Sequence, residues 1–185
     1  SDTPLELPQL LAWLQDDGLL DAAQAAAINA QAALLPAPAL HPLCSIAHGA
    51  LTLDTLCAWL ARRASLPYLR IDPLHIDFSQ VADVMTAGYA ARFNILPVEC
   101  TLDRIVIATA QPYALAWQAQ LGNLAPRKLS LVIANPLHIA DAIAQFFSLA
   151  SAVKVAKLAS TQDLALRQNV EQLVELGRNK SSLDA

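Results

Sequence analysis

Glycine, basic residues and long apolar runs are all scarce in this sequence of 185 residues, and each scarcity argues against one class of protein. Only 5 glycines occur, all isolated, so no G-x-x-x-x-G-K-[ST] loop is present to hold the phosphates of a nucleotide. The 12 basic residues are outnumbered by 16 acidic ones and form no cluster, whereas nucleic-acid binding requires clustered Lys and Arg. No apolar run reaches the ~18 residues that span a bilayer. We therefore expect no catalysis by this chain alone, no nucleic-acid partner and no direct insertion into a membrane.

Cysteine is scarce as well. Cys44, Cys57 and Cys100 are odd in number and form no C-x-x-C pair, which favours free buried thiols in a reducing compartment. The first residues, Ser-Asp-Thr-Pro, lack the basic start and the apolar stretch of a signal peptide. We therefore expect the protein to stay in the cytoplasm.

One group of residues has the composition of a zinc site: His41, Cys44, His48 and Cys57. Their spacing is not that of a zinc finger, and both cysteines coincide with apolar positions of the helical pattern. Core thiols and polar histidines at helix ends are the simpler interpretation. We expect no metal site here.

Ala and Leu, by contrast, are abundant. Hydrophobic residues make up 55% of the sequence and charged residues 15%, which favours helices around a buried core. Residues 1–66 are expected to form a helical subdomain of two hairpins. In the first, leucines at helical spacing stop before Gly18 and Asp21 caps the next helix; in the second, a short helix ends at Gly49 and Thr52 opens a longer one. We interpret the hairpins as one repeated unit that cannot bury its apolar face alone.

The pattern changes after residue 66, and residues 67–148 are expected to form an α+β subdomain. The expected elements are a helix at 79–93 capped by Ser79, strands at 95–100 and 104–109, a helix at 114–124, a strand at 128–134 and a helix at 137–147. This order predicts an α+β fold with a small, mostly antiparallel sheet. Residues 149–185 are expected to be a linker with one amphipathic helix that ends at Gly177.

Several segments resemble, in their order along the chain, one known family. The second hairpin keeps Gly49, Leu51, Leu56 and Leu60 of that family's repeated unit, with Arg63 where the family has Gln. Four further segments resemble its later parts: residues 64–68 (ASLPY), 91–98 (ARFNILPV), 104–108 (RIVIA) and 170–177 (VEQLVELG). The sequence thus resembles the N-terminal domain of the type II secretion ATPase (general secretory pathway protein E) and of its type IV pilus and mannose-sensitive pilus relatives.

The resemblance implies a docking domain that recruits such an ATPase to the cytoplasmic domain of an inner-membrane platform protein. It implies a cytoplasmic location, peripheral to the inner membrane through that partner. The ATPase core would lie in the same chain, and ATP and Mg²⁺ would bind only there, so we expect no cofactor in this segment. The acidic hairpins and the open sheet edge are both possible docking surfaces. We favour a surface containing the sheet-side helices and the groove between the helical and α+β sections.

In part of this family the paired hairpins also bind cyclic di-GMP, so a cyclic di-GMP sensor is the alternative function. The resemblance would place that site at Gly18, Leu19, Leu20, Gln31, Gly49, Leu51 and Arg63. The family unit opens with Arg-Leu-Gly, but this sequence has Gln9-Leu10-Leu11 and Leu40-His41-Pro42 in those places. Each lost arginine contact to an anion costs about 1.5–3 kcal/mol, so we expect binding to be weakened by roughly two to four orders of magnitude.

Overall fold

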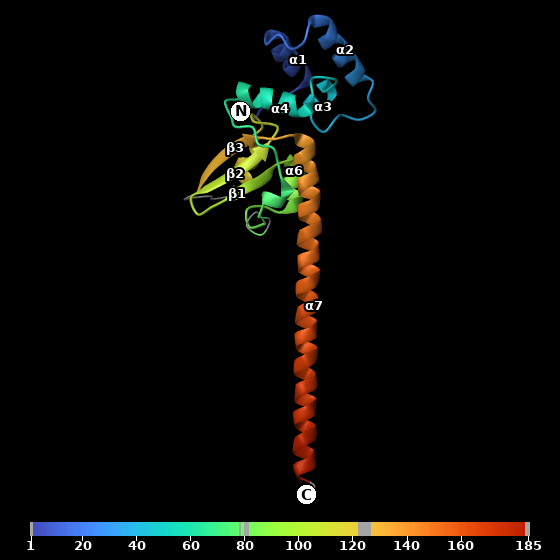
Figure 1. Cartoon of the computed structure of the whole chain (residues 1–185), viewed down its shortest axis with the longest axis vertical. Coiled ribbons are helices and arrows are strands. Elements are labelled where there is room, and N and C mark those ends of the chain that lie inside the picture. The colour runs from blue at the N-terminus through green and yellow to red at the C-terminus, as the bar shows by residue number, and fades with distance from the viewer. Residues whose placement is uncertain (1, 78, 80–81, 122–126, 184–185) are drawn as a thin grey trace. The chain divides into compact units, whose positions relative to one another are not determined.

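A computed structural model describes residues 2–77, 79, 82–121 and 127–183 (Figure 1). The chain divides into two compact units, Ser1–Ala144 and Gln145–Ala185, and each is described by itself. The first unit combines N-terminal helices with a small sheet, which confirms the predicted α+β fold. The finer division of the sequence at residues 66 and 148 stays a prediction.

The helical section of the first unit contains α1 (Leu7–Asp16), α2 (Ala22–Ala33), α3 (Pro42–Ile46) and α4 (Leu53–Arg63). Local capping chemistry sets where two of these helices begin. The Asp21 carboxylate accepts from the Gln24 N–H at 2.7 Å, and the Gln24 side chain accepts from the Asp21 N–H at 3.0 Å. The Thr52 hydroxyl accepts from the Thr55 N–H at 3.2 Å. Both helix starts predicted from Asp21 and Thr52 are therefore confirmed.

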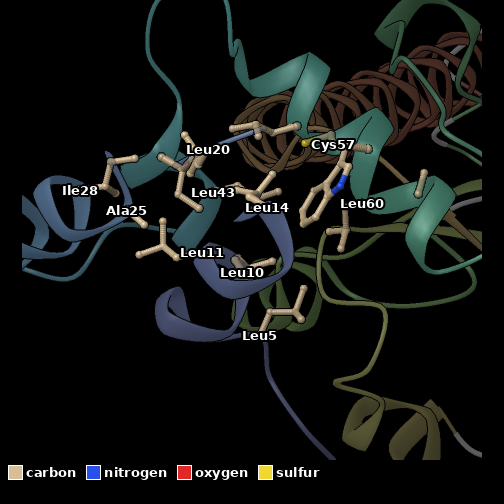
Figure 2. Close-up of a cluster of buried hydrophobic side chains, with 14 of the residues drawn as sticks. Leu5, Leu10, Leu11, Leu14, Leu20, Ala25, Ile28, Leu43, Cys57 and Leu60 are labelled. Atoms are coloured by element: carbon tan, nitrogen blue, oxygen red, sulfur yellow. The ribbon is translucent and has the colours of Figure 1, made fainter. Parts of the chain in front are cut away.

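A hydrophobic core joins these helices (Figure 2). Leucines at helical spacing on α1 and α4 give each helix one apolar face. Residues with no exposed surface come from both hairpins: Leu10, Leu14, Leu43, Ile46, Leu56 and Leu60. Burial of one such side chain contributes about 1.5–3 kcal/mol, so each hairpin is stabilised by the apolar face of the other.

The α+β section contains η1 (Pro73–His75), α6 (Ala87–Phe93), β1 (Leu96–Cys100), β2 (Arg104–Thr109), η2 (Ala116–Leu121), β3 (Lys128–Ile133) and the start of α7 (Pro136–Leu183). Its core includes Ile105 and Ile107 of β2 and Ile139 and Ile143 of α7. Residues 105–109 of β2 are all buried, as expected for the central strand of a sheet that is covered on both faces.

The sheet is mixed, which corrects the expectation of a mostly antiparallel sheet. Its strand order is β1-β2-β3, with β1 antiparallel and β3 parallel to β2. Parallel neighbours need a crossover of a dozen or more residues, and residues 110–127 provide one between β2 and β3. Alternation of apolar residues does not distinguish the two strand directions, so the sequence pattern could not decide between them.

Two helices of this section differ from their expected bounds. α6 begins at Ala87 rather than at Ser79, because the Thr86 hydroxyl caps it by accepting from the Tyr89 N–H at 3.1 Å. Residues 80 and 81 of the expected helix lie outside the described residues. The helix expected at 114–124 is the shorter 3₁₀ helix η2, and residues 122–124 of that expectation also lie outside the described part.

α7 is one continuous helix, whereas separate helices ending near residue 147 and at Gly177 were expected. After Pro136 the sequence contains no proline, and most residues are good helix formers. An interior glycine costs only about 1 kcal/mol, which is too little to end the helix at Gly177. In the second unit, Leu158, Leu166 and Leu173 are exposed. Within the described residues, no helix combines the length and apolar character needed to cross a bilayer.

Candidate functional site

The turn after α1 holds three of the residues predicted for a ligand site. Gly18 has a φ of +74°, a left-handed conformation that favours glycine. A Cβ built there would meet nothing within 4 Å, so the backbone conformation, not crowding, requires glycine. Leu19 is 40% exposed, whereas Leu20 is 5% exposed and belongs to the helical core. Of the two leucines, only Leu19 is open to a ligand.

The corresponding turn of the second hairpin repeats this arrangement. Gly49 has a φ of +55° within a tight turn, where His48 and Leu51 exchange backbone hydrogen bonds of 2.9 and 3.0 Å. Leu51 packs against the same core as Leu20. The two turns therefore share a left-handed glycine followed by an apolar residue that packs into the helical core, which fits a repeated unit.

The last two predicted site residues lie on different helices. Gln31 is exposed near the end of α2, and Arg63 is the last residue of α4. The Arg63 guanidinium lies 3.1 Å from a carboxylate oxygen of Asp17 and stacks over the ring of Trp13 at 4.5 Å. Arg63 is therefore already engaged within the protein.

Asp17 is the centre of this group of side chains, which we call the Asp17 cluster: Trp13, Asp17, Trp59 and Arg63. The Trp59 ring N–H donates to the Asp17 carboxylate at 2.7 Å. Trp59 is 4% exposed and packs in the core, while Trp13 is half-buried at the core's edge. The cluster ties the end of α1 to α4 by one charge-assisted hydrogen bond and one ion pair.

Removal of the Asp17 carboxylate should therefore destabilise the helical section. We expect Asp17→Ala to lower the free energy of unfolding by about 1–2 kcal/mol, because the buried Trp59 N–H loses its acceptor. Urea unfolding monitored by tryptophan fluorescence measures this change. Asp16→Ala is the matched control and should change stability by less than about 0.5 kcal/mol. Equal losses for the two variants would contradict the role of the cluster.

In each hairpin, the residue that replaces the family's arginine is more exposed than the residue that replaces its glycine. Gln9 and Leu40, at the arginine positions, are exposed, Leu40 by 53%. Leu11, at a glycine position, is 4% exposed in the core, and Pro42 is the first residue of α3. The arginine positions are therefore open to substitution, while the glycine positions have taken structural roles. Gln9 also lines a small hollow of about 400 Å³ with Trp13 and Tyr113.

His41 caps α3 and also links the helical section to the α+β section. Its ring is 2% exposed, and its Nδ1 accepts from the Leu43 N–H at 3.1 Å, which caps α3. Its Nε2–H then donates to the backbone oxygen of Ala110 at 2.7 Å, across to the α+β section. Burial lowers the pKa of His41 to about 4, so the ring is neutral at pH 7. Both ring nitrogens are used, so neither is free for a metal.

The thiols near His41 do not resemble metal ligands either. Burial raises the pKa of Cys57 to about 12 and also raises that of Cys44, so both stay protonated. Among the described residues no group of three His, Cys, Asp or Glu side chains is placed to hold a metal ion. Cys57 is a small core residue, and Cys44 is half-buried.

A second surface of interest lies along the sheet. A groove of about 980 Å³ runs between the strands and residues 66–76, and its lining is mainly apolar. Half-buried side chains from the strands and from this segment contribute to it: Leu66, Leu69, Ile71, Val98, Leu131 and Val132. Apolar side chains left half-covered in a groove of this size suit a protein or peptide ligand.

The acidic side chains around the groove have partners, but one basic side chain forms no ion pair with a described residue. Glu99 pairs with Arg104 at 2.7 Å, and Asp72 pairs with His75 at 2.6 Å. Arg70 also lines the groove, and no described side chain forms an ion pair with it. Both acidic residues in the lining thus have partners, while Arg70 has only a longer-range attraction to Asp54, which favours a ligand that carries a carboxylate.

Comparison with known proteins agrees with this fold. Residues 64–153 match the MshEN domain family. The type IV pilus assembly ATPase TfpB of Acinetobacter baylyi is 34% identical over 127 residues, which cover 68% of this chain and 22% of TfpB. The chain is related to the N-terminal domains of secretion and pilus assembly ATPases.

Two solved structures match about three quarters of this chain. The structure of MshE with cdg is 26% identical, with a TM-score of 0.55, and the match covers 74% of this chain and 97% of that one. The N-terminal domain of XpsE is 16% identical, with a TM-score of 0.47, over 76% of this chain and 96% of that one. Because the chain spans only 22% of TfpB, the activity and partners of a whole assembly ATPase are proposals for this protein.

Proposed function

We propose that this chain is the N-terminal docking domain of a type II secretion or type IV pilus ATPase. It recruits the ATPase to the cytoplasmic domain of the inner-membrane platform protein, and works in the cytoplasm at the membrane surface. The observation that carries this proposal is the match of 68% of the chain to only 22% of a pilus assembly ATPase. We infer that this segment is one part of a larger ATPase, and the groove along its sheet offers a surface for a protein.

The groove along the sheet supports a docking role. Its apolar lining would be covered by a partner, and Arg70 would meet an acidic residue of that partner. We assign no catalysis to this segment. We place the binding of ATP and Mg²⁺ in an ATPase core that belongs to the same protein but lies outside these 185 residues. The helix of residues 145–183 is then the link towards that core.

Titration calorimetry of the intact chain with the cytoplasmic platform domain tests the proposal. We expect a complex with a dissociation constant in the micromolar range, about −8 kcal/mol. Arg70→Glu should weaken binding about tenfold or more, because it places a negative charge where an acid of the partner is expected. Arg92→Glu on α6, outside the groove lining, is the control and should bind like the unmodified chain. Absence of binding at about 100 μM would contradict the docking function.

Cyclic di-GMP sensing is the second candidate, because the similar MshE structure was determined with cdg. Gly18 and Gly49, which the resemblance assigns to that site, both lie in left-handed turns. Against it, both family arginines are replaced, and Arg63 is held by Asp17 and Trp13. We therefore rank this function second.

A further inference from the structure

Over most of its length, the outer edge of β3 has no backbone partner among the described residues. Lys128 N–H donates to the Asp103 oxygen at 2.8 Å and Ala134 N–H donates to the Thr109 oxygen at 3.1 Å, so the even-numbered residues turn their backbone groups towards β2 and the turn before it. Backbone groups of neighbouring residues in a strand point in opposite directions. The odd-numbered residues of β3 therefore turn their N–H and C=O groups away from β2.

Ile133 confirms this direction. Its N–H donates to the Pro67 oxygen at 2.8 Å, and its oxygen accepts from the Leu69 N–H at 2.8 Å. Residues 67–69 thus form a single bridge with the end of β3. By the same alternation, Leu129 and Leu131 direct their backbone groups to this edge, and no described residue pairs with them there.

The opposite edge of the sheet is protected by contrast. β1 contains Pro97, which has no N–H, and its register with β2 shifts between Pro97 and Glu99. Prolines and bulges are the usual means by which an edge strand is closed to further pairing. β3 has neither between Leu129 and Leu131.

We propose that the outer edge of β3 is a strand-addition site that takes an extended segment of the platform protein's cytoplasmic domain. This inference rests on the proposed docking function and names how the docking occurs. The added strand pairs with Leu129 and Leu131 and continues the pairing that residues 67–69 already make at Ile133. Leu129, Ser130 and Leu131 also line the groove, so alternate side chains of the added strand enter it.

The charges at this edge define the chemistry of the segment. Lys128 is exposed at the start of β3, and Arg70 lines the groove without an ion pair among the described side chains. The segment that fits is extended, has alternating apolar side chains and carries at least one Asp or Glu.

Amide hydrogen exchange of the intact chain, measured residue by residue by NMR, tests the site. In the free chain, Leu129 and Leu131 should exchange faster than Ser130 and Val132, whose amides bond to β2. Addition of the cytoplasmic platform domain should slow Leu129 and Leu131 by about tenfold or more. If the domain binds while these two amides keep their free rates, strand addition is wrong and the docking function stands. If the domain does not bind, both proposals fall.

Two variants and a dilution series complete the test. Leu129→Pro removes an outward N–H without removing a bond to β2, and Leu129→Thr shortens the side chain but keeps that N–H. We expect the proline variant to bind the platform domain about tenfold more weakly than the threonine variant. Equal affinities would overturn the proposal. Protection of Leu129 and Leu131 that rises with the concentration of the chain alone would also overturn it, because a second copy would then be the occupant.

Discussion

Replacement of His41 by alanine is expected to lower the free energy of unfolding by about 2–4 kcal/mol. The variant loses the cap of α3, worth about 1 kcal/mol, and leaves the buried oxygen of Ala110 without its donor, at a further cost of about 1–3 kcal/mol. His41→Asn keeps an acceptor at the cap and should recover about 1 kcal/mol of the loss. Urea unfolding measures both variants.

A control for this substitution is available seven residues away. The ring of His48 contacts the oxygen of Ile46, two residues before it, at 2.7 Å and is exposed. His48→Ala should therefore change stability by less than about 1 kcal/mol. If the His41 and His48 variants are equally stable, the link between the helical and α+β sections does not depend on His41.

The same residue should make stability depend on pH. The folded pKa of His41 is about 4, below its ordinary value of 6.5, so the unfolded chain binds the proton first on acidification. Its contribution is complete above pH 6.5 and is lost as the pH falls towards 4, by about 3 kcal/mol in all. The unmodified chain should lose that much more stability over this interval than His41→Asn does. If the free energy of unfolding falls equally with pH in the two proteins, burial of the neutral His41 ring does not cause the pH dependence.

The helical hairpins could be read from the sequence because their signals are local. Asp21 and Thr52 mark helix starts through hydrogen bonds to residues three positions away, and leucine spacing marks the buried faces. The left-handed glycines follow from the same short-range chemistry. None of these features depends on a contact between distant parts of the chain.

The features that sequence reasoning missed depend on such distant contacts. His41 bonds to Ala110 across 69 positions, and Asp17 bonds to Trp59 across 42. The direction of β3 is set by its crossover from β2. The alternation of apolar and polar residues along a strand is the same for both directions. Arg63 was placed in the candidate ligand site because of its position in the repeat, yet Asp17 and Trp13 already engage it.

The last prediction concerns the alternative ligand. We expect the unmodified chain to bind cyclic di-GMP no more tightly than about 100 μM, because neither hairpin has the family arginine. Both positions, Gln9 and Leu40, are exposed, so arginine can be introduced at each without disturbing the core. Gln9→Arg and Leu40→Arg should each tighten binding about tenfold or more, and the double variant by roughly two to four orders of magnitude.

Calorimetry with cyclic di-GMP measures these affinities at one fixed salt concentration, since added positive charge strengthens binding of any anion. Leu102→Arg is the matched control: Leu102 is 88% exposed in the turn between β1 and β2, so the variant adds the same charge away from both hairpins. If Leu102→Arg tightens binding as much as the hairpin variants, the gain is a general charge effect. If the unmodified chain already binds at low micromolar concentration, the missing arginines are not needed. Sensing would then become the leading function, because Gly18, Leu19, Gly49 and their neighbours would form a working site without them.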